Sequence, residues 1–376
     1  MLTISVSAAL SLAVHATSKA EDIQLVRLGF SGPLSGANAA AGKDALNGMQ
    51  MAVERLNQQA LQIEGKALRF EVVARDDQSN PQRGLEIARE LSASRINALL
   101  GPFTSGVAMT SIKVYNDAAI PVLTIASNPK VTQANLNYVF RIAASDADIG
   151  AKLAQYAARN LKLKSIAVID DGSVYAQGLI DAFQKSARSM GLQISSREKL
   201  SDTADDASVS RTLQTLRNDK APAIFFGGYA AQGGRLLKAM QQLKMDAMLL
   251  GGDALCAADL VRLAGDSLGN NTYCAEGGVW LTRAADGAVF SAGYQRRFAY
   301  APDVYAATYY DGVMLLAQAI KSSGSIAGPQ LLPALLKSRY KGVTASYEFT
   351  GQRELKESTV TILRFKGSTL VPLASF

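Results

Sequence analysis

Histidine is nearly absent from this chain. Among 376 residues the one histidine is His15, and it lies in an N-terminal segment that we expect to be removed on export. A mature chain without histidine has no Ser-His-Asp or Cys-His catalytic site, no histidine-ligated zinc and no imidazole general base. We therefore expect a protein that is not an enzyme and that holds neither a metal nor a cofactor.

Long apolar runs are also absent. No run after the N-terminus reaches the ~18 apolar residues that a membrane-spanning helix needs. Residues 1–20, MLTISVSAALSLAVHATSKA, place an apolar stretch before small residues, which is typical of a secretory signal peptide, although the basic n-region is missing. We predict cleavage after Ala20, and Ala16 satisfies the same small-residue rule. The sequence thus predicts export to the periplasm without a membrane anchor.

Cysteine is limited to Cys256 and Cys274. An oxidising compartment favours a disulfide between them. Two buried free thiols are the alternative, because the sequence does not show whether the two Cα atoms lie within bonding range.

Basic residues exceed acidic residues, 39 against 32, which gives a formal net charge of +7. Such an excess can mark a surface that binds nucleic acid. Here the lysines and arginines are spread along helical segments, with no dense basic block and no interleaved aromatic residues. We expect a basic soluble surface and no nucleic acid partner.

The rest of the sequence alternates short apolar runs with longer segments of helical periodicity. This order predicts βαβ units and largely parallel sheets, the α/β fold class. A first series of strands is predicted at residues 23–29, 68–74, 98–100 and 122–125. A second series is predicted at 165–170, 223–226 and 247–250. Helices at 308–321 and 329–336 and terminal strands near 347–349 and 359–365 follow. Because the chain is longer than one core usually holds, each series predicts a separate lobe.

The candidate ligand sites are the loops at the carboxyl ends of the predicted strands, where open α/β sheets bind ligands. GPFTSG places Ser105 at the start of a helix, where a hydroxyl and free amides can bind a carboxylate. A plain N-cap role for Ser105 is the alternative. GGD places Asp253 beside two glycines, where it can meet an ammonium group or serve as a turn residue.

Two pairs of adjacent acids, Asp76-Asp77 and Asp170-Asp171, have the composition of a metal site or an acid-base pair. Neither pair has a histidine or a third carboxylate in register. We therefore favour a structural role for both pairs.

Seven motifs then identify a family resemblance. They are GFSGPLSGANAAAGKDALNGMQMAVERLN, ARDDQSNP, GPFTS, PVLTIASN, IAVIDDGSVYAQG, FFGGY and GGD. In this order and spacing the chain resembles the branched-chain amino-acid (leucine/isoleucine/valine)-binding proteins of ABC importers, which are type I periplasmic binding proteins. The resemblance runs from Glu21 to about Phe365.

The resemblance implies a Venus-flytrap fold: two Rossmann-like lobes with parallel-type sheets and a three-crossing hinge. The crossings are expected near Ala144, Ala275 and Tyr347. Residues 21–144 with 276–346 would form the N-terminal lobe, and residues 145–275 with 347–376 the C-terminal lobe.

The resemblance also implies a set of ligand-binding residues. Ser105, Ala126, Ser127 and Asn128 would bind the carboxylate and ammonium groups of an amino acid, Tyr175 would cover it from the other lobe, Tyr229 would lie beside the polar groups, Asp253 would pair with the ammonium and Tyr305 would flank the side chain. A zwitterion needs donors for its carboxylate and an anion for its ammonium. Dividing these groups between two lobes makes closure depend on the ligand.

The implied function is capture of a small branched-chain or aliphatic amino acid by a monomer, which delivers it to the membrane permease of an ABC importer. One position departs from the family. Members often place an aromatic residue before the glycine that matches Gly42, whereas this chain has Ala41. The change enlarges or reshapes the side-chain pocket, so a larger apolar or aromatic amino acid stays open as the ligand.

Two other functions are rivals. One is a sensor on the same fold that binds an amide-type small molecule and controls a partner protein, against which the export signal argues. The other is an extracytoplasmic hydrolase, which needs a general base that a histidine-free chain does not obviously offer.

Overall fold

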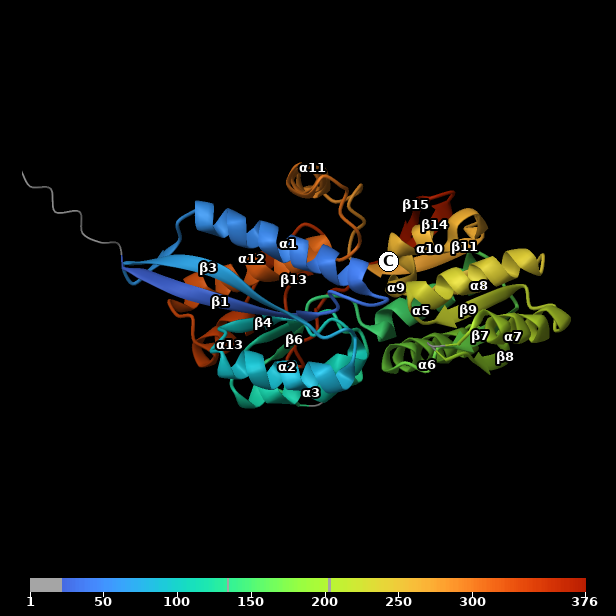
Figure 1. The fold of residues 1–376 in the computed structure, drawn as a ribbon, viewed down its shortest axis with the longest axis horizontal. Coiled ribbons are helices and arrows are strands. Elements are labelled where there is room, and N and C mark those ends of the chain that lie inside the picture. Colours follow the sequence, from blue (N-terminus) through green and yellow to red (C-terminus); the bar gives the residue numbers. More distant parts are fainter. Residues whose placement is uncertain (1–21, 134, 202–203) are drawn as a thin grey trace, which may run out of the picture.

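The computed structural model describes residues 22–133, 135–201 and 204–376, which form two α/β lobes side by side (Figure 1). The predicted signal peptide at residues 1–20 lies outside the described residues. None of the helices in the described part of the chain is both long and apolar enough to cross a membrane. The predicted two-lobe α/β fold is confirmed.

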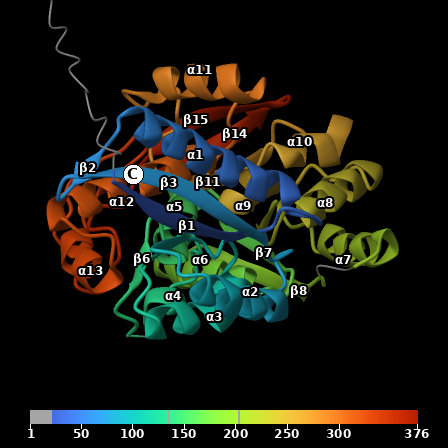
Figure 2. The same ribbon diagram turned by 60° about the vertical axis from the view of Figure 1, so that its left-hand side comes forward.

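The first lobe is built on a six-stranded sheet with the order β2-β3-β1-β4-β5-β6. Its strands are β1 (Ile23–Gly32), β2 (Gln62–Ile63), β3 (Lys66–Asp76), β4 (Ala98–Leu100), β5 (Val122–Thr124) and β6 (Val139–Arg141). Its helices are α1 (Ala39–Gln58), α2 (Pro81–Ala93), α3 (Ser105–Asp117), α4 (Lys130–Gln133), α11 (Gly287–Phe298), α12 (Ala306–Ser323) and α13 (Gly328–Leu336). Helices α1 and α12 cover one face of the sheet, and α2 and α3 cover the other (Figure 1 and Figure 2).

Local sequence explains how these elements form and pack. Helix α2 starts at Pro81, and the side chain of Asn80 caps it by accepting hydrogen bonds from the first free backbone amides. Helices α1 and α12 approach so closely at Gly48 that a Cβ there would lie 1.9 Å from the carbonyl oxygen of Ala306. A late segment of the chain is therefore fixed against the earliest helix, and the chain must return to the first lobe.

The second lobe is built on a seven-stranded sheet with the order β15-β14-β11-β10-β9-β7-β8. Its strands are β7 (Ser165–Asp170), β8 (Gln193–Lys199), β9 (Ala223–Gly227), β10 (Met248–Gly251), β11 (Thr272–Gly277), β14 (Val360–Lys366) and β15 (Thr369–Ser375). Its helices are α5 (Asp146–Arg159), α6 (Val174–Ser189), α7 (Asp206–Asn218), α8 (Ala230–Gln242), α9 (Asp253–Cys256) and α10 (Asp259–Ala264), with a 3₁₀ turn at Gly265–Ser267.

Successive side chains of the central strands of the second sheet point to opposite faces, and apolar residues fill both faces. Val168 and Phe225 belong to the core under α5 and α6, while their neighbours Ile169 and Phe226 belong to the core that includes α7 and α8. All four side chains have no exposed surface. Continuous apolar runs are what a parallel strand covered on both faces requires.

Strand β6 of the first sheet ends at Arg141 and α5 begins at Asp146, while β11 of the second sheet ends at Gly277 and β14 begins at Val360. We expect the three crossings next to these ends. Residues 348–355 still contact the first lobe, because the backbone amide of Arg141 donates to the carbonyl of Arg353 at 3.0 Å and Phe349 packs edge-on against Phe140. The short strand β13 (Ser346–Tyr347) pairs only with β12 (Tyr340–Lys341). The lobe boundaries stay a prediction, and these contacts favour a third crossing nearer Thr359 than Tyr347.

Cys256 and Cys274 lie side by side in the second lobe. Their Cα atoms are 5.4 Å apart and their sulfur atoms are in bonding contact, which closes a loop with a sequence separation of 18 residues. Both side chains have no exposed surface. The bond ties α9, which starts at the strand end that carries Asp253, to the neighbouring strand β11.

Replacing both cysteines by serine (Cys256→Ser with Cys274→Ser) is expected to lower the free energy of unfolding by about 3 kcal/mol, the chain-entropy value for a loop of this length. Thermal unfolding with and without a reducing agent measures the effect. Reduction should lower the melting temperature of the wild type and leave that of the double variant unchanged. Equal melting of the oxidised and reduced wild type would show that the bond contributes nothing.

Candidate functional site

The loops at the carboxyl ends of several strands of both sheets meet between the lobes, and a small space of about 20 Å³ lies there. Its walls are formed by Phe103, Thr104, Ser105, Ile125 and Ser127 from the first lobe, Tyr175, Tyr229, Asp253 and Ala254 from the second, and Tyr305 before α12. We call this space the cleft. Six of the eight predicted ligand-binding residues line it, and Ala126 and Asn128 do not.

The first lobe contributes the start of helix α3. Thr104, and not Ser105, is the N-cap residue, and its extended backbone leads into the helix. The N-cap role considered for Ser105 is therefore wrong: Ser105 is the first helical residue, and its Oγ accepts a hydrogen bond from the backbone amide of Asn128 at 3.3 Å. The free amides of the first helical turn and the helix dipole make this end of the cleft suited to an anion.

Thr104 is a residue of the cleft wall that was not predicted from the sequence. Its hydroxyl oxygen is buried, has no hydrogen-bond partner among the described residues and belongs to the cleft wall. Buried hydroxyls normally have a partner, so Thr104 is a further candidate for contact with a ligand. Thr104 could have been predicted from its position beside Ser105 in the motif GPFTS.

The second lobe contributes an acid. Asp253 begins α9, separated by one residue from the end of strand β10, and its Oδ1 accepts a hydrogen bond from the hydroxyl of Tyr175 at 2.8 Å. Burial raises the pKa of Asp253 above its ordinary value, and the bond from Tyr175 opposes that rise. The rings of Tyr175 and Tyr229 lie 5.1 Å apart beside the carboxylate. This end of the cleft is suited to a cation.

A second space, also of about 20 Å³, adjoins the cleft and shares Phe103, Tyr229, Ala254 and Tyr305 with it. Its other walls are formed by Ala37, Asn38, Ala41, Ala230, Ala257 and Asp259. Phe103 and Tyr305 meet edge to face at 4.8 Å between the two spaces. We call this second space the apolar extension of the cleft, because alanine and aromatic residues form most of its walls besides Asn38 and Asp259. The departure at Ala41 thus lies on its wall.

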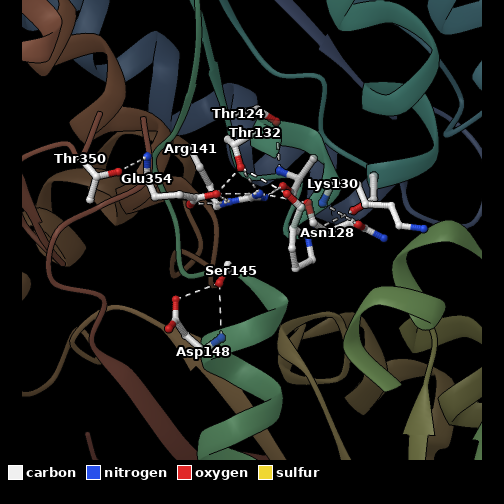
Figure 3. Close-up of polar contacts among 12 residues, drawn as sticks. Thr124, Asn128, Lys130, Thr132, Arg141, Ser145, Asp148, Thr350 and Glu354 are labelled. Atoms are coloured by element: carbon white, nitrogen blue, oxygen red, sulfur yellow. Dashed lines mark hydrogen bonds and ion pairs between the residues drawn. The ribbon is translucent and has the colours of Figure 1, made fainter. Parts of the chain in front are cut away.

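Arg141 holds the loop that carries Ala126 and Asn128 (Figure 3). Its side chain has no exposed surface; Nη1 donates to the carbonyl of Ala126 and Nη2 to the carbonyl of Asn128 at 3.0 Å. Glu354, from the segment before the third crossing, pairs with Arg141 at 2.9 Å. Neither residue of this ion pair was predicted from the sequence. The ligand-binding roles of Ala126 and Asn128 stay predictions.

The loop also contacts the other lobe. The side-chain amide of Asn128 donates to the carbonyl of Val174, at the start of α6, at 2.7 Å. Asp146, at the start of α5, is fully buried near the same point; burial and next the charge of Asp253 raise its pKa well above the ordinary value. The lobes are therefore in contact around the cleft.

A family model described as "Periplasmic binding protein" matches residues 25–369, which is most of the chain. The chain belongs to the periplasmic binding protein family. It is 29% identical over 251 residues to the Leu/Ile/Val-binding protein BraC3 of Rhizobium johnstonii, an alignment that spans 66% of each chain. It is 27% identical over 369 residues to an "Amino acid binding protein" of Pseudomonas aeruginosa, over 96% of this chain and 94% of that one.

A solved relative has the same fold. The substrate binding protein LivJ of the branched-chain amino acid transporter from Streptococcus pneumoniae, in complex with isoleucine, superposes with a TM-score of 0.85 at 24% identity, over 94% of this chain and 99% of that chain. The predicted resemblance to the Leu/Ile/Val-binding proteins is confirmed.

In this periplasmic binding protein the paired acids bind backbone and side-chain groups of their own lobes. Asp76 accepts from the amide of Leu34 at 2.8 Å, Asp77 accepts from the hydroxyl of Ser31 at 2.9 Å, and Asp170 pairs with Arg197 at 2.7 Å. No group of three potential metal ligands occurs in the part of the chain that the structure describes.

Asp303 adds a hydrogen-bonded link between the lobes of the binding protein. Its two carboxylate oxygens accept from the backbone amide of Ala258 at 3.0 and 2.9 Å. Burial, and next the charge of Asp44, raise the pKa of Asp303 to about 7, and Asp259 adds to the rise. A carboxyl group whose folded pKa is raised stabilises the fold below its unfolded pKa and loses that contribution as the pH rises through the folded pKa.

We therefore expect the free energy of unfolding to fall between about pH 4 and pH 7, with a contribution from Asp303 on the order of 2–4 kcal/mol. Asp303→Asn should show a smaller fall, measured by urea unfolding across this pH range. Asp246→Asn, which removes an exposed acid from the same protein, should match the wild type. Identical pH profiles for the wild type and Asp303→Asn would contradict the assignment.

Proposed function

We propose that this protein captures an α-amino acid with an aliphatic side chain in the cleft and delivers it to the membrane permease of an ABC importer. The observation that carries the proposal is the pairing of a helix N-terminus with a carboxylate across one small space between the lobes. The protein acts outside the cytoplasm as a monomer and catalyses no reaction.

Each end of the ligand has partners in this proposal. Its carboxylate is bound by Ser105, Ser127, Thr104 and the free amides at the start of α3. Its ammonium is bound by Asp253, with the carbonyl of Ala126 as a second acceptor. Its side chain points into the apolar extension beside Tyr305 and Ala41, which favours leucine or a larger apolar amino acid over a small one.

The charge of the cleft supports an amino acid over a simple carboxylic acid. The residues that line the cleft include Asp253 and no lysine or arginine. A ligand with only a carboxylate would bring a second negative charge beside Asp253 in a poorly hydrated space, which is unfavourable. An ammonium group on the same ligand neutralises Asp253 and makes a charge-assisted hydrogen bond.

The cleft must open to admit such a ligand, because its space is close to that needed by one water molecule, ~10–15 Å³. We propose that the lobes separate at the three crossings and that the ligand stabilises the closed state. Closure brings α6 against the first lobe at Gly178, where a Cβ would lie 2.7 Å from the side-chain amide nitrogen of Asn128. The same Cβ would lie 2.7 Å from Oδ2 of Asp146, which belongs to the second lobe itself.

Gly178→Ala is accordingly expected to weaken ligand binding by roughly 10-fold, since about 1.4 kcal/mol of hindrance to closure corresponds to that factor. The melting temperature of the ligand-free protein should fall only slightly, because the methyl crowds the Asp146 side chain within the second lobe while alanine favours the helix over glycine. Isothermal titration measures the affinity. Gly191→Ala lies just after the same helix, where the methyl meets open space but the backbone φ is +74°. It strains the fold without touching the other lobe, so it shows what a loss of stability alone does to the affinity. Unchanged affinity in Gly178→Ala would contradict the proposed closure contact.

A ligand screen tests the function. The mature protein is unfolded and refolded to remove carried-over ligand, and its melting temperature is measured with the common amino acids, with benzoate, with leucinamide and with acetamide. A ligand that binds only the native state raises the melting temperature with its concentration. Stabilisation by leucine, isoleucine, valine or phenylalanine, and not by benzoate or leucinamide, is the expected result. Stabilisation by acetamide alone would favour a sensor that binds amides. Release of ammonia from leucinamide would show that the protein is a hydrolase.

A further inference from the structure

A second cavity, of about 180 Å³, lies behind Tyr305 and beside the second crossing. Its walls include Val279, Trp280 and Leu281, just after the crossing, and Val304 and Ala307, at the start of α12. No residue lines both this cavity and the cleft. We call it the hinge cavity. Its volume is below the ~300–1,000 Å³ of sites for drug-sized ligands, so it suits a smaller organic molecule.

One end of the hinge cavity is acidic. Glu276, at the end of β11, lines it and is 9% exposed, and its Oε2 has no hydrogen-bond partner among the described residues. Asp303 lies on the wall as well, and neither lysine nor arginine does. Burial raises the pKa of Glu276 well above its ordinary value, and the charges of Asp253 and Asp303 add to the rise.

A buried carboxyl oxygen without a partner is costly. A cationic donor would satisfy it and offset the repulsion between Glu276 and its acidic neighbours. The remaining walls are mostly apolar, and Trp280 offers an aromatic face that can attract a cation. The complementary molecule is therefore a small primary amine with an apolar body.

We propose that the hinge cavity is a second ligand site, which binds a small alkyl or aryl amine with its ammonium on Glu276. Such a molecule would contact β11 of the second lobe and α12 of the first, and so would favour their closed arrangement. Val304 lines the hinge cavity and its neighbour Tyr305 lines the cleft. Occupation of the hinge cavity would thus strengthen binding in the cleft, and the coupling must be reciprocal.

Trp280 gives a direct readout, because it is the one tryptophan of the chain. Refolded protein is titrated with 3-methylbutylamine and with 3-methylbutanol, which has the same carbon skeleton and no charge, while tryptophan fluorescence is recorded. We expect a saturable change with the amine and at least about 10-fold weaker binding of the alcohol. Absence of a saturable change with the amine would overturn the proposal.

Variants locate the amine. Glu276→Gln keeps the shape of the side chain and should weaken amine binding about 10-fold, and Ala307→Met, which fills the cavity, should abolish it. Asp253→Asn removes the acid of the cleft, which is a charged neighbour of Glu276 but does not line the hinge cavity, so it should weaken amine binding far less than Glu276→Gln does. Loss of amine binding in Asp253→Asn, or unchanged binding in both hinge-cavity variants, would overturn the proposal by placing the amine in the cleft or elsewhere.

Leucine titrations, followed by thermal shift with and without the amine, test the coupling. We expect the amine to raise the affinity for leucine several-fold, in the range of ordinary allosteric coupling. Unchanged affinity for leucine in the presence of bound amine would overturn the coupling. If leucine does not bind at all, the proposed amino-acid function fails, while the fluorescence titrations still decide whether the hinge cavity binds an amine.

Discussion

Replacing Asp253 by asparagine is expected to weaken the binding of leucine or a similar amino acid by about 100-fold or more. Removing one partner of a buried, hydrogen-bonded charge pair costs roughly 2–5 kcal/mol, much of it from the partner left without a counter-charge. The ammonium of the ligand would be that partner. Asparagine still offers an oxygen to the hydroxyl of Tyr175, which donates to Asp253 at 2.8 Å, so the shape of the site is kept.

The folded protein itself should not suffer from this change. Burial raises the pKa of Asp253, so its charge is unfavourable in the ligand-free closed structure, and Asp253→Asn should leave the melting temperature equal or slightly higher. Isothermal titration and thermal unfolding measure the two effects separately. Asp246→Asn removes an exposed acid from the same lobe and should bind leucine normally. Retention of leucine affinity in Asp253→Asn would refute Asp253 as the ammonium partner.

The central strands were predictable because their sequences are continuous apolar runs. The strand at Ala98–Leu100 is observed where it was predicted, and so is the strand at Ser165–Asp170. Strand β8, Gln193–Lys199, was missed because it lies at the edge of the sheet and contains mostly polar residues with alternating partial burial. Strand β11, Thr272–Gly277, was missed because Thr272 and Glu276 interrupt its short apolar segment, although the strand is buried.

The site was predictable as a set of loops, because open α/β sheets bind ligands at strand ends whatever the details of the sequence. The ion pair that holds one of those loops in place was not predictable. Arg141 and Glu354 are separated by 213 positions, and Glu354 belongs to the polar segment GQRELKE, which gives no sign of a buried partner. Only the folded chain shows that the third crossing segment reaches back to the loop containing Ala126 and Asn128.

Replacing Glu354 by alanine is expected to lower the free energy of unfolding by about 3 kcal/mol, because it leaves the buried guanidinium of Arg141 without a counter-charge. Glu354 is partly exposed, with 29% of its side-chain surface accessible, which keeps the effect at the lower end of the range for buried pairs. Glu348→Ala removes an exposed ion pair with Lys356 from the same segment, where both side chains are accessible. Such pairs contribute about 0–1 kcal/mol, so this control should unfold nearly like the wild type.

A double variant separates stability from ligand binding. Arg141→Met with Glu354→Leu removes both charges, and apolar replacement of a buried ion pair is often neutral or stabilising, so part of the stability lost in Glu354→Ala should return. Leucine affinity should stay about 10-fold below that of the wild type, because methionine cannot donate to the carbonyls of Ala126 and Asn128, and an unpaired buried carbonyl costs about 1–3 kcal/mol. If the double variant recovers full affinity together with stability, Arg141 supports the fold alone and does not position the ligand-binding loop.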